Sequence, residues 1–525
     1  MNIQSYKLPV GTMQMVRGWH RPAVHLDRRL ILTGLGLFGL GVALFALIQF
    51  HTPNLAGNDG YYHIKLAQVM REQGLHPAFE WLPLTILSPE AYVDHHFLYH
   101  VLLMPFTFGD LREGAKWASV ILPAAAFLAG WLLLRGQQVP LASWWALGFF
   151  AVSEAFLYRL SMPRAQAVSL LALILSLHLL LTQRYRWLLP LAFLYVWLYD
   201  AFPLILILAG GYVTVQWLLD RRLTLAPLGY SAAGIMAGLI INPYFPNNLI
   251  FIYHHLLPKL TETTAISVGN EWQPYQTWTL VENSGPALLV FIAGVVALGL
   301  SERRMSTPTA TVLFSAVLFG AMLLKSRRFV EYYPAFALLF CALAWSPLLR
   351  QWTQSRTWIG RVLPVILALL LVPAITANVQ AAQESLASSK PYQLFADASQ
   401  WLKENSPAGS RVFQTDWDDF TRLYFYNTHN TYTLGLDPTY MQLQDPALYD
   451  LWVDVTRGRV EAPAQIIRDT FGASFVLTDL DHDDFLEEAE ADPQLDEVYR
   501  DQYAVIFRVQ PSSTVMKEVH QTIAH

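Results

Sequence analysis

Four groups of residues in this sequence have types and spacings that suit chemistry at a membrane surface. The first lies in GNDGYYHIKLAQVMREQG, where Asp59 precedes an aromatic pair and a histidine. The segment AYVDHHFLYH follows it and holds Asp94, His95 and His96. A carboxylate and imidazoles held close together can bind a divalent cation or act as a base. Helix capping is the competing interpretation, with Asn58 or Asp59 beginning a helix that ends at Gly74.

The second and third groups are cationic. YRLSMPRAQ carries Arg159 and Arg164, and KSRRFVEYYP carries Lys325, Arg327 and Arg328. Cations packed together in this way suit a phosphate or pyrophosphate, because the guanidinium fork matches the oxygens of these groups. Both segments also fit side chains that reach out to lipid headgroups.

The fourth group is a loop of about 40 residues at 246–285, which contains Glu271 in TAISVGNEWQPYQTW. A long loop with an acidic residue among small and aromatic ones suits a lid or one wall of a site. An ordinary exposed glutamate is the alternative.

The elements that must position these residues are apolar. Of 525 residues, 54% are hydrophobic and 14% are charged, whereas about a quarter of the residues of a typical soluble protein are charged. Runs of about 20 apolar residues are long enough to cross the hydrocarbon core of a bilayer. The first run follows an arginine-rich segment and is typical of a retained signal anchor. We predict about eleven transmembrane helices, at 30–50, 115–134, 141–158, 165–182, 187–201, 203–219, 225–245, 285–300, 308–324, 329–348 and 362–378.

The distribution of positive charge predicts the orientation, since short cytoplasmic loops are rich in Lys and Arg. Eleven helices that start inside put ten arginines in cytoplasmic loops and six Lys or Arg in short outer loops. The apolar stretch 97–108 has 12 residues and is better interpreted as a partly inserted helix. The prediction is therefore a cytoplasmic segment 1–29 and a membrane domain 30–378 with large outer loops 51–114 and 246–285. All four groups then lie on the outer face.

The tail 379–525 has a different composition, with 24 of the 40 acidic and 10 of the 35 basic residues, so its net charge is −14. Amphipathic patterns predict helices from Asp397 to Asn405 and from Pro446. Strand-like patterns occur in RVFQTDW, RLYFY, TYTLGL, SFVLTDL and YAVIFRV. The tail is therefore predicted to be a soluble α/β domain outside the cytoplasm.

The order of these motifs resembles the catalytic subunits of oligosaccharyltransferases and, more broadly, GT-C glycosyltransferases that use polyprenyl-linked sugars. Asp59 in GNDGYYH resembles the family's first-loop aspartate, and NEWQPYQTW resembles its later loop glutamate at Glu271. RRFVEYYP resembles the segment whose arginine contacts the donor phosphate. WLKENSPAGSRVFQTDWDDF resembles the start of the family's C-terminal domain, and its acceptor-reading WWDYG is replaced here by Asp416 to Phe420.

The resemblance implies a polytopic α-helical GT-C-like membrane domain with a C-terminal α/β domain. It implies transfer of a sugar from a polyprenyl phosphate or pyrophosphate donor to a protein or glycan acceptor at the outer face. Membrane lipids are expected partners, nucleic acid is not, and the expected location is a bacterial inner membrane with the N-terminus in the cytoplasm.

The implied roles of individual residues are as follows. Asp59 and Glu271 are the catalytic candidates. The donor phosphate would contact Lys325, Arg327, Arg328, Arg164 and Arg159. A divalent cation, Mg²⁺ or Mn²⁺, would bind among Asp59, Asp94, His95, His96 and Glu271. The acceptor would contact Trp417, Asp418 and Asp419. SMPRAQ lacks the carboxylates of the family's Asp-rich metal motif in the second outer loop, which puts the cation in question.

Three alternatives remain open from the sequence. A lipid-linked polysaccharide polymerase or ligase would use the same outer face with a glycan acceptor. A transporter or flippase of a lipid-linked substrate would place polar residues at mid-membrane, where Asp200 between adjoining spans is the one candidate. The third alternative is a non-enzymatic assembly subunit.

Overall fold

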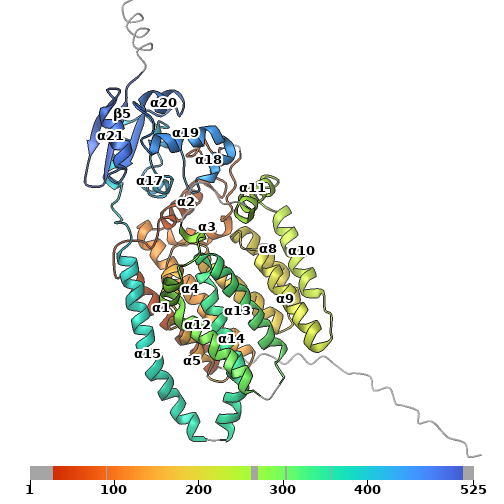
Figure 1. The fold of residues 1–525 in the computed structure, drawn as a ribbon. Coiled ribbons are helices and arrows are strands. Elements are labelled where there is room, and N and C mark those ends of the chain that lie inside the picture. The colour runs from red at the N-terminus through yellow and green to blue at the C-terminus, as the bar shows by residue number, and fades with distance from the viewer. Residues whose placement is uncertain (1–27, 90, 262–269, 302–303, 356, 512–525) are drawn as a thin grey trace, which may run out of the picture.

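The computed structural model describes residues 28–511, except 90, 262–269, 302–303 and 356. A bundle of long helices forms one part of the molecule, and a smaller domain containing a β-sheet covers one end of it (Figure 1). The predicted cytoplasmic segment 1–29 lies almost wholly outside the described residues.

Seven described helices are long and apolar enough to cross a membrane. They are α1 (Arg28–Gln49), α4 (Leu111–Gly136), α9 (Pro203–Asp220), α12 (Thr277–Leu300), α13 (Thr307–Lys325), α14 (Tyr333–Ser355) and α15 (Thr357–Ala387). Shorter apolar helices are α3 (Phe97–Leu103) with η1 (Met104–Phe106), α7 (Gln166–Leu181), η3 (Tyr185–Trp187) with α8 (Leu188–Leu198), and α10 (Ala226–Ile240). Helix α15 continues beyond the predicted domain boundary at 378.

The predicted span 141–158 is wrong as one continuous helix. It is divided into α5 (Ala142–Leu147), η2 (Gly148–Phe150) and α6 (Glu154–Leu160). The break has a local cause, because the Ser153 side chain accepts a hydrogen bond from the backbone N–H of Phe156 and thereby starts a new helix.

The loop 51–114, predicted to be an outer loop, leaves the bundle and returns to it at the same end. It contains α2 (Asp59–Gln73) and the short helix α3–η1, and both lie next to the C-terminal domain (Figure 1). The stretch 97–108, predicted to be a partly inserted helix, contains a short helix that ends at Phe106, and its partial insertion stays a prediction. Gly74, at φ 103°, ends α2 as predicted.

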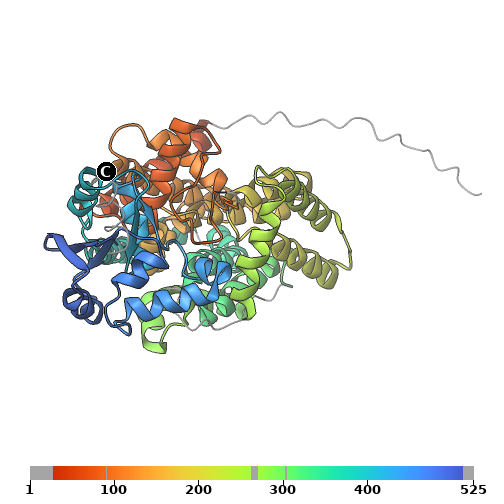
Figure 2. The ribbon, with the colours of Figure 1, turned by 90° about the horizontal axis from the view of Figure 1, so that it is seen from above.

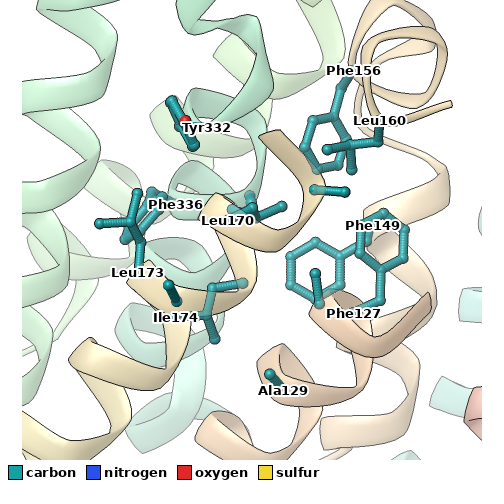
Figure 3. Packing of buried hydrophobic residues seen from close by; sticks show 14 of the residues in the cluster. Phe127, Ala129, Phe149, Phe156, Leu160, Leu170, Leu173, Ile174, Tyr332 and Phe336 are labelled. Carbon is teal, nitrogen blue, oxygen red and sulfur yellow. The ribbon is translucent and has the colours of Figure 1, made fainter. Parts of the chain in front are cut away.

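The core of the bundle fixes the helices that carry the cationic groups. Phe127 of α4 packs against Phe149 of η2 and Phe156 of α6, with ring centroids 4.9 and 5.7 Å apart. Leu170 of α7 and Phe336 of α14 extend this cluster (Figure 3). Between helices surrounded by lipid, close packing of this kind supplies most of the attraction. It therefore holds α6, α7 and η5 (Arg327–Glu331) in fixed relative positions.

The C-terminal domain is a mixed sheet with helices around it. The strand order is β2-β1-β3-β5-β4; β1 pairs in parallel with β2 and β3, and β5 pairs antiparallel with β3 and β4. Seen from above, the domain, in blue, lies over one side of the bundle (Figure 2). Its elements are α16 (Ala396–Asn405), β1 (Arg411–Gln414), η6 (Trp417–Asp419), α17 (Phe420–Tyr426), β2 (Thr431–Tyr432), α18 (Thr439–Gln444), α19 (Pro446–Thr456), α20 (Ala464–Asp469), β3 (Phe475–Asp479), α21 (Asp483–Ala491), β4 (Leu495–Arg500) and β5 (Ala504–Val509).

The strand predicted for RLYFY is wrong, because these residues belong to helix α17. Its rings pack on α2: Tyr62 lies 6.4 Å from Phe420 and 5.7 Å from Tyr424, centroid to centroid. Aromatic residues favour strands only weakly, and packing against a neighbouring element overrides that preference. This contact docks the domain onto the loop 51–114.

Candidate active site

A cavity of about 910 Å³ lies between the C-terminal domain and the end of the bundle that faces it. Ligand sites commonly have volumes of roughly 300–1,000 Å³. Residues from all four predicted groups line this one cavity. They include Asp59, His95, His96, Arg164, Glu271 and Arg328, together with Trp417 and Asp418 of the C-terminal domain.

The first residue of α2 forms an ion pair across this cavity. Asp59 Oδ2 lies 2.5 Å from Arg164 Nη2. The two segments can approach because Gly60 has no side chain: a Cβ at Gly60 would lie 2.5 Å from Cγ of Pro163. The capping interpretation is wrong for Asn58, whose side chain makes no capping hydrogen bond and contacts Asp418 and Arg422 instead.

Glu271 is at the centre of an arginine cluster. Its Oε2 lies 2.9 Å from Arg159 Nη2 and 3.2 Å from Arg164 Nη1, and its Oε1 lies 3.0 Å from Arg328 Nη1. Burial alone would raise the pKa of Glu271, but the guanidinium groups of Arg164, Arg328 and Arg159 outweigh it and hold the pKa well below its usual range. Glu271 is therefore a permanent anion that orients three arginines.

A second acidic residue completes the cluster, and sequence reasoning missed it. Glu331, only 1% exposed, accepts from Arg159 Nε at 2.8 Å. Asp59, Glu271 and Glu331 thus face three guanidinium groups, so the protein charges balance. Each guanidinium has five N–H donors. The described carboxylate contact of Arg328 uses fewer than five, so some of its donors remain for other partners. Glu331 follows the cationic RRF closely in the sequence, and that proximity was the available signal.

The predicted set of Lys325, Arg327 and Arg328 is divided in the structure. Of these three residues, only Arg328 lines the cavity. Its guanidinium donates to the Tyr199 hydroxyl and lies 4.8 Å from the centroid of the Trp272 ring. Arg327 instead donates to the backbone carbonyl of Gln273. Because the 3₁₀ turn η5 points neighbouring side chains in different directions, adjacent cations reach different surroundings.

The predicted cation shell is not assembled. Asp94 Oδ1 accepts from the backbone N–H of His96 at 2.9 Å, and its Oδ2 lies 2.7 Å from His100 Nδ1. His95 Nε2 lies 4.0 Å from Asp200 Oδ2. Within the described part of the chain, no three His, Cys, Asp or Glu side chains are grouped to hold a metal ion. The Arg164 guanidinium contacts both Asp59 and Glu271, so these two carboxylates do not fit a shared ion.

Two of the three residues predicted to contact the acceptor line the cavity, and the third does not. Trp417 and Asp418 line the cavity, whereas Asp419 is buried at 2% exposure and does not. The Asn58 side-chain amide donates to Asp418 Oδ2 and thereby links the two domains. Burial, with the nearby charges of Asp59 and Asp416, raises the pKa of Asp418 to about 6.

Asp418→Asn is expected to stabilise the protein above pH 6. The raised pKa means that the folded state keeps a proton between about pH 4 and 6 that the unfolded state has lost, so ionisation above pH 6 opposes folding. An amide removes this cost, which is up to about 3 kcal/mol for a shift of roughly two pKa units. Thermal unfolding in detergent at pH 4 and pH 8 measures it. The gain should appear at pH 8 alone and be absent in Asp450→Asn, an exposed control on α19. Equal changes at both pH values would contradict the assignment.

Comparison with known proteins gives a result at the level of structure. No family model matches the sequence, and no curated protein matches it. The oligosaccharyltransferase of Archaeoglobus fulgidus is similar in structure, with 15% identity, a TM-score of 0.64, and 85% of this chain and 69% of that chain covered. ArnT from Cupriavidus metallidurans is also similar, with 14% identity and a TM-score of 0.55. The match covers 92% of this chain and 99% of ArnT. The arabinofuranosyltransferase AftD from Mycobacteria has 15% identity and a TM-score of 0.58. The match covers 91% of this chain and 40% of AftD.

Proposed function

We propose, on the premise of the GT-C fold that this protein shares with these enzymes, that it transfers a sugar from a polyprenyl phosphate or pyrophosphate to an acceptor. The reaction would take place at the extracytoplasmic face of the membrane. One observation carries the proposal: Asp59, Arg164, Glu271 and Arg328, which are far apart in the sequence, line a single cavity beneath the C-terminal domain.

The donor's phosphate suits the arginine side of the cavity. Arg164 and Arg328 offer fixed N–H donors to phosphate oxygens, and these charge-assisted hydrogen bonds would stabilise the leaving phosphate as the glycosidic bond breaks. The same cavity has an apolar side formed by Leu204, Ile207 and Met322, which suits the first isoprene units. ArnT has been solved with undecaprenyl phosphate and the Archaeoglobus enzyme with a dolichol-phosphate.

The acceptor suits the part of the cavity formed by the C-terminal domain, which Trp417 and Asp418 line. We assign Asp59 to contact the acceptor's attacking group, since its Oδ2 is paired with Arg164 and a carboxylate has further lone pairs that can accept from a ligand. The acceptor class is a protein or a glycan. The Archaeoglobus enzyme has been solved with a tethered acceptor peptide.

The expected location is a bacterial inner membrane with the C-terminal domain outside. Helices α7 and α9 begin next to the cavity, which Gln166 and Pro203 line, and their far ends lead into loops that contain Arg184, Arg186, Arg221 and Arg222. Such loops are typical of the cytoplasmic side.

A reconstituted transfer assay tests the function. Purified protein in lipid is incubated with a polyprenyl-linked labelled sugar and, in separate arms, a peptide library, a glycan or water. Formation of a glycosylated product is expected, and the arm that yields it identifies the acceptor class. Movement of the intact donor across the bilayer without cleavage would favour a flippase and contradict the proposal. Turnover is expected to persist in excess EDTA, because Arg164 already provides the positive charge between Asp59 and Glu271.

A further inference from the structure

A chain of three hydrogen-bonded side chains leads from the protein interior to the cavity. Asp94 Oδ2 lies 2.7 Å from His100 Nδ1, and His100 Nε2 lies 2.8 Å from His63 Nδ1. The exposed fractions are 6% for Asp94, 0% for His100 and 5% for His63. Asp94 precedes α3, His100 is on α3, and His63 is on α2. Of the three, His63 alone lines the cavity.

The chemistry of the groups determines where the protons lie. An ionised carboxylate only accepts, so His100 Nδ1–H donates to Asp94. His100 Nε2 is then an acceptor, and His63 Nδ1–H donates to it. This leaves the lone pair of the neutral His63 ring on Nε2, the nitrogen that has no hydrogen-bond partner among the described residues. Burial holds the pKa of His63 well below its usual range, and the nearby Arg164 guanidinium lowers it further, so the ring is neutral at pH 7.

His63 also has the right position relative to the proposed acceptor contact. It follows Asp59 by four residues on α2, so both side chains lie on one face of the helix. Both line the cavity. Asp59 is engaged by Arg164, whereas the His63 ring is backed by an acceptor chain that ends in a negative charge. Such a chain stabilises the imidazolium that forms when the ring takes a proton.

We propose that His63 Nε2 accepts the proton from an acceptor hydroxyl, with Asp59 orienting that hydroxyl and with His100 and Asp94 as positioning residues. This inference rests on the proposed function. In the step, the hydroxyl oxygen forms a bond to the sugar's anomeric carbon, and the carbon–oxygen bond to the phosphate breaks. The leaving phosphate keeps that electron pair near Arg328, and the hydroxyl proton moves to His63 Nε2. No other reactant is needed.

The test compares His63→Gln, His63→Ala and Asp94→Asn with wild type in the transfer assay. His63→Gln is expected to lower kcat by about 10²- to 10⁴-fold, the usual contribution of general base catalysis, and to change the donor KM less than threefold. Asp94→Asn should lower kcat by about the same factor, because an amide can hold His100 in the wrong tautomer. Added imidazole should restore part of the activity of His63→Ala, a result that a purely structural role would not produce. His76→Gln, an exposed histidine of the same outer loop, is the matched control.

The outcomes separate the two claims. Absence of transfer by the wild-type protein would refute the proposed function itself. Transfer by wild type with an equal kcat in His63→Gln would refute the role of His63 and leave the function intact. Thermal unfolding shows whether His63→Gln folds. If it does not, the kcat of Asp94→Asn and the imidazole rescue of His63→Ala test the role of His63. A kcat unchanged in Asp94→Asn, together with no rescue, overturns the inference.

Discussion

Arg328→Gln should raise the KM for a polyprenyl-linked donor by about 10- to 150-fold, the equivalent of one lost hydrogen bond to a charged group. Arg328 lines the cavity, and its guanidinium is fixed by Glu271, by the Tyr199 hydroxyl and by the Trp272 ring. These contacts orient its remaining donors before the ligand arrives, so little entropy is lost on binding. Steady-state kinetics with varied donor concentration measure the effect.

The neighbouring arginine provides the control for this prediction. Arg327→Gln removes the same charge one residue away, but Arg327 does not line the cavity and bonds to the backbone of Gln273. Its donor KM should change less than threefold. Arg328→Lys keeps the positive charge but loses the forked N–H donors of the guanidinium group. It should therefore recover only part of the affinity for the donor. Equal donor KM values for Arg327→Gln and Arg328→Gln would contradict the assignment of the phosphate to Arg328.

Asp59→Asn should lower kcat by at least about 100-fold, as expected when a group that orients a reactant is lost. The substitution keeps the shape of the side chain and removes the charge that pairs with Arg164. Arg164 would then turn fully to Glu271, and the acceptor would lose the carboxylate that aligns it. Single-turnover transfer with saturating donor isolates this step from donor binding.

Glu72→Gln serves as the matched control, because Glu72 is on the same helix, is 51% exposed in its side chain, and pairs with Arg71. Its turnover should match wild type. Thermal unfolding of Asp59→Asn in detergent shows whether the fold survives, since a guanidinium that loses one of its partners costs stability. A folded Asp59→Asn protein with wild-type kcat would remove Asp59 from the reaction.

The ion cluster explains why these effects should be specific. Three guanidinium groups close together repel one another, and Glu271 and Glu331 hold them in place at a distance set by hydrogen bonds. Glu271 is therefore better described as the anion that organises the proposed phosphate site than as a base. We therefore propose that Glu271 acts on the reaction only through the arginines that it holds in place.

The sequence carried much of the architecture because the membrane and the helix period act locally. Apolar runs long enough to span a bilayer marked most of the long helices, and α2, α16, β1, β3 and β5 appeared where the patterns indicated. The predictions failed where a local signal competed with packing. The helix α17 has the residues of a strand but packs on Tyr62, and the span 141–158 is interrupted where Ser153 caps a new helix.

The sequence by itself determined which chemical groups this protein brings to the cavity: Asp59, the arginines, Glu271 and the histidines. Only the tertiary structure decided how they pair. Arg328 lines the cavity while Arg327 bonds to the backbone of Gln273, and Asp94 Oδ2 pairs with His100 Nδ1. The physical reason is that a side chain's partners depend on segments far away in the chain. Asp59 meets Arg164 because Gly60 leaves room for Pro163, and no local pattern in either segment encodes that approach.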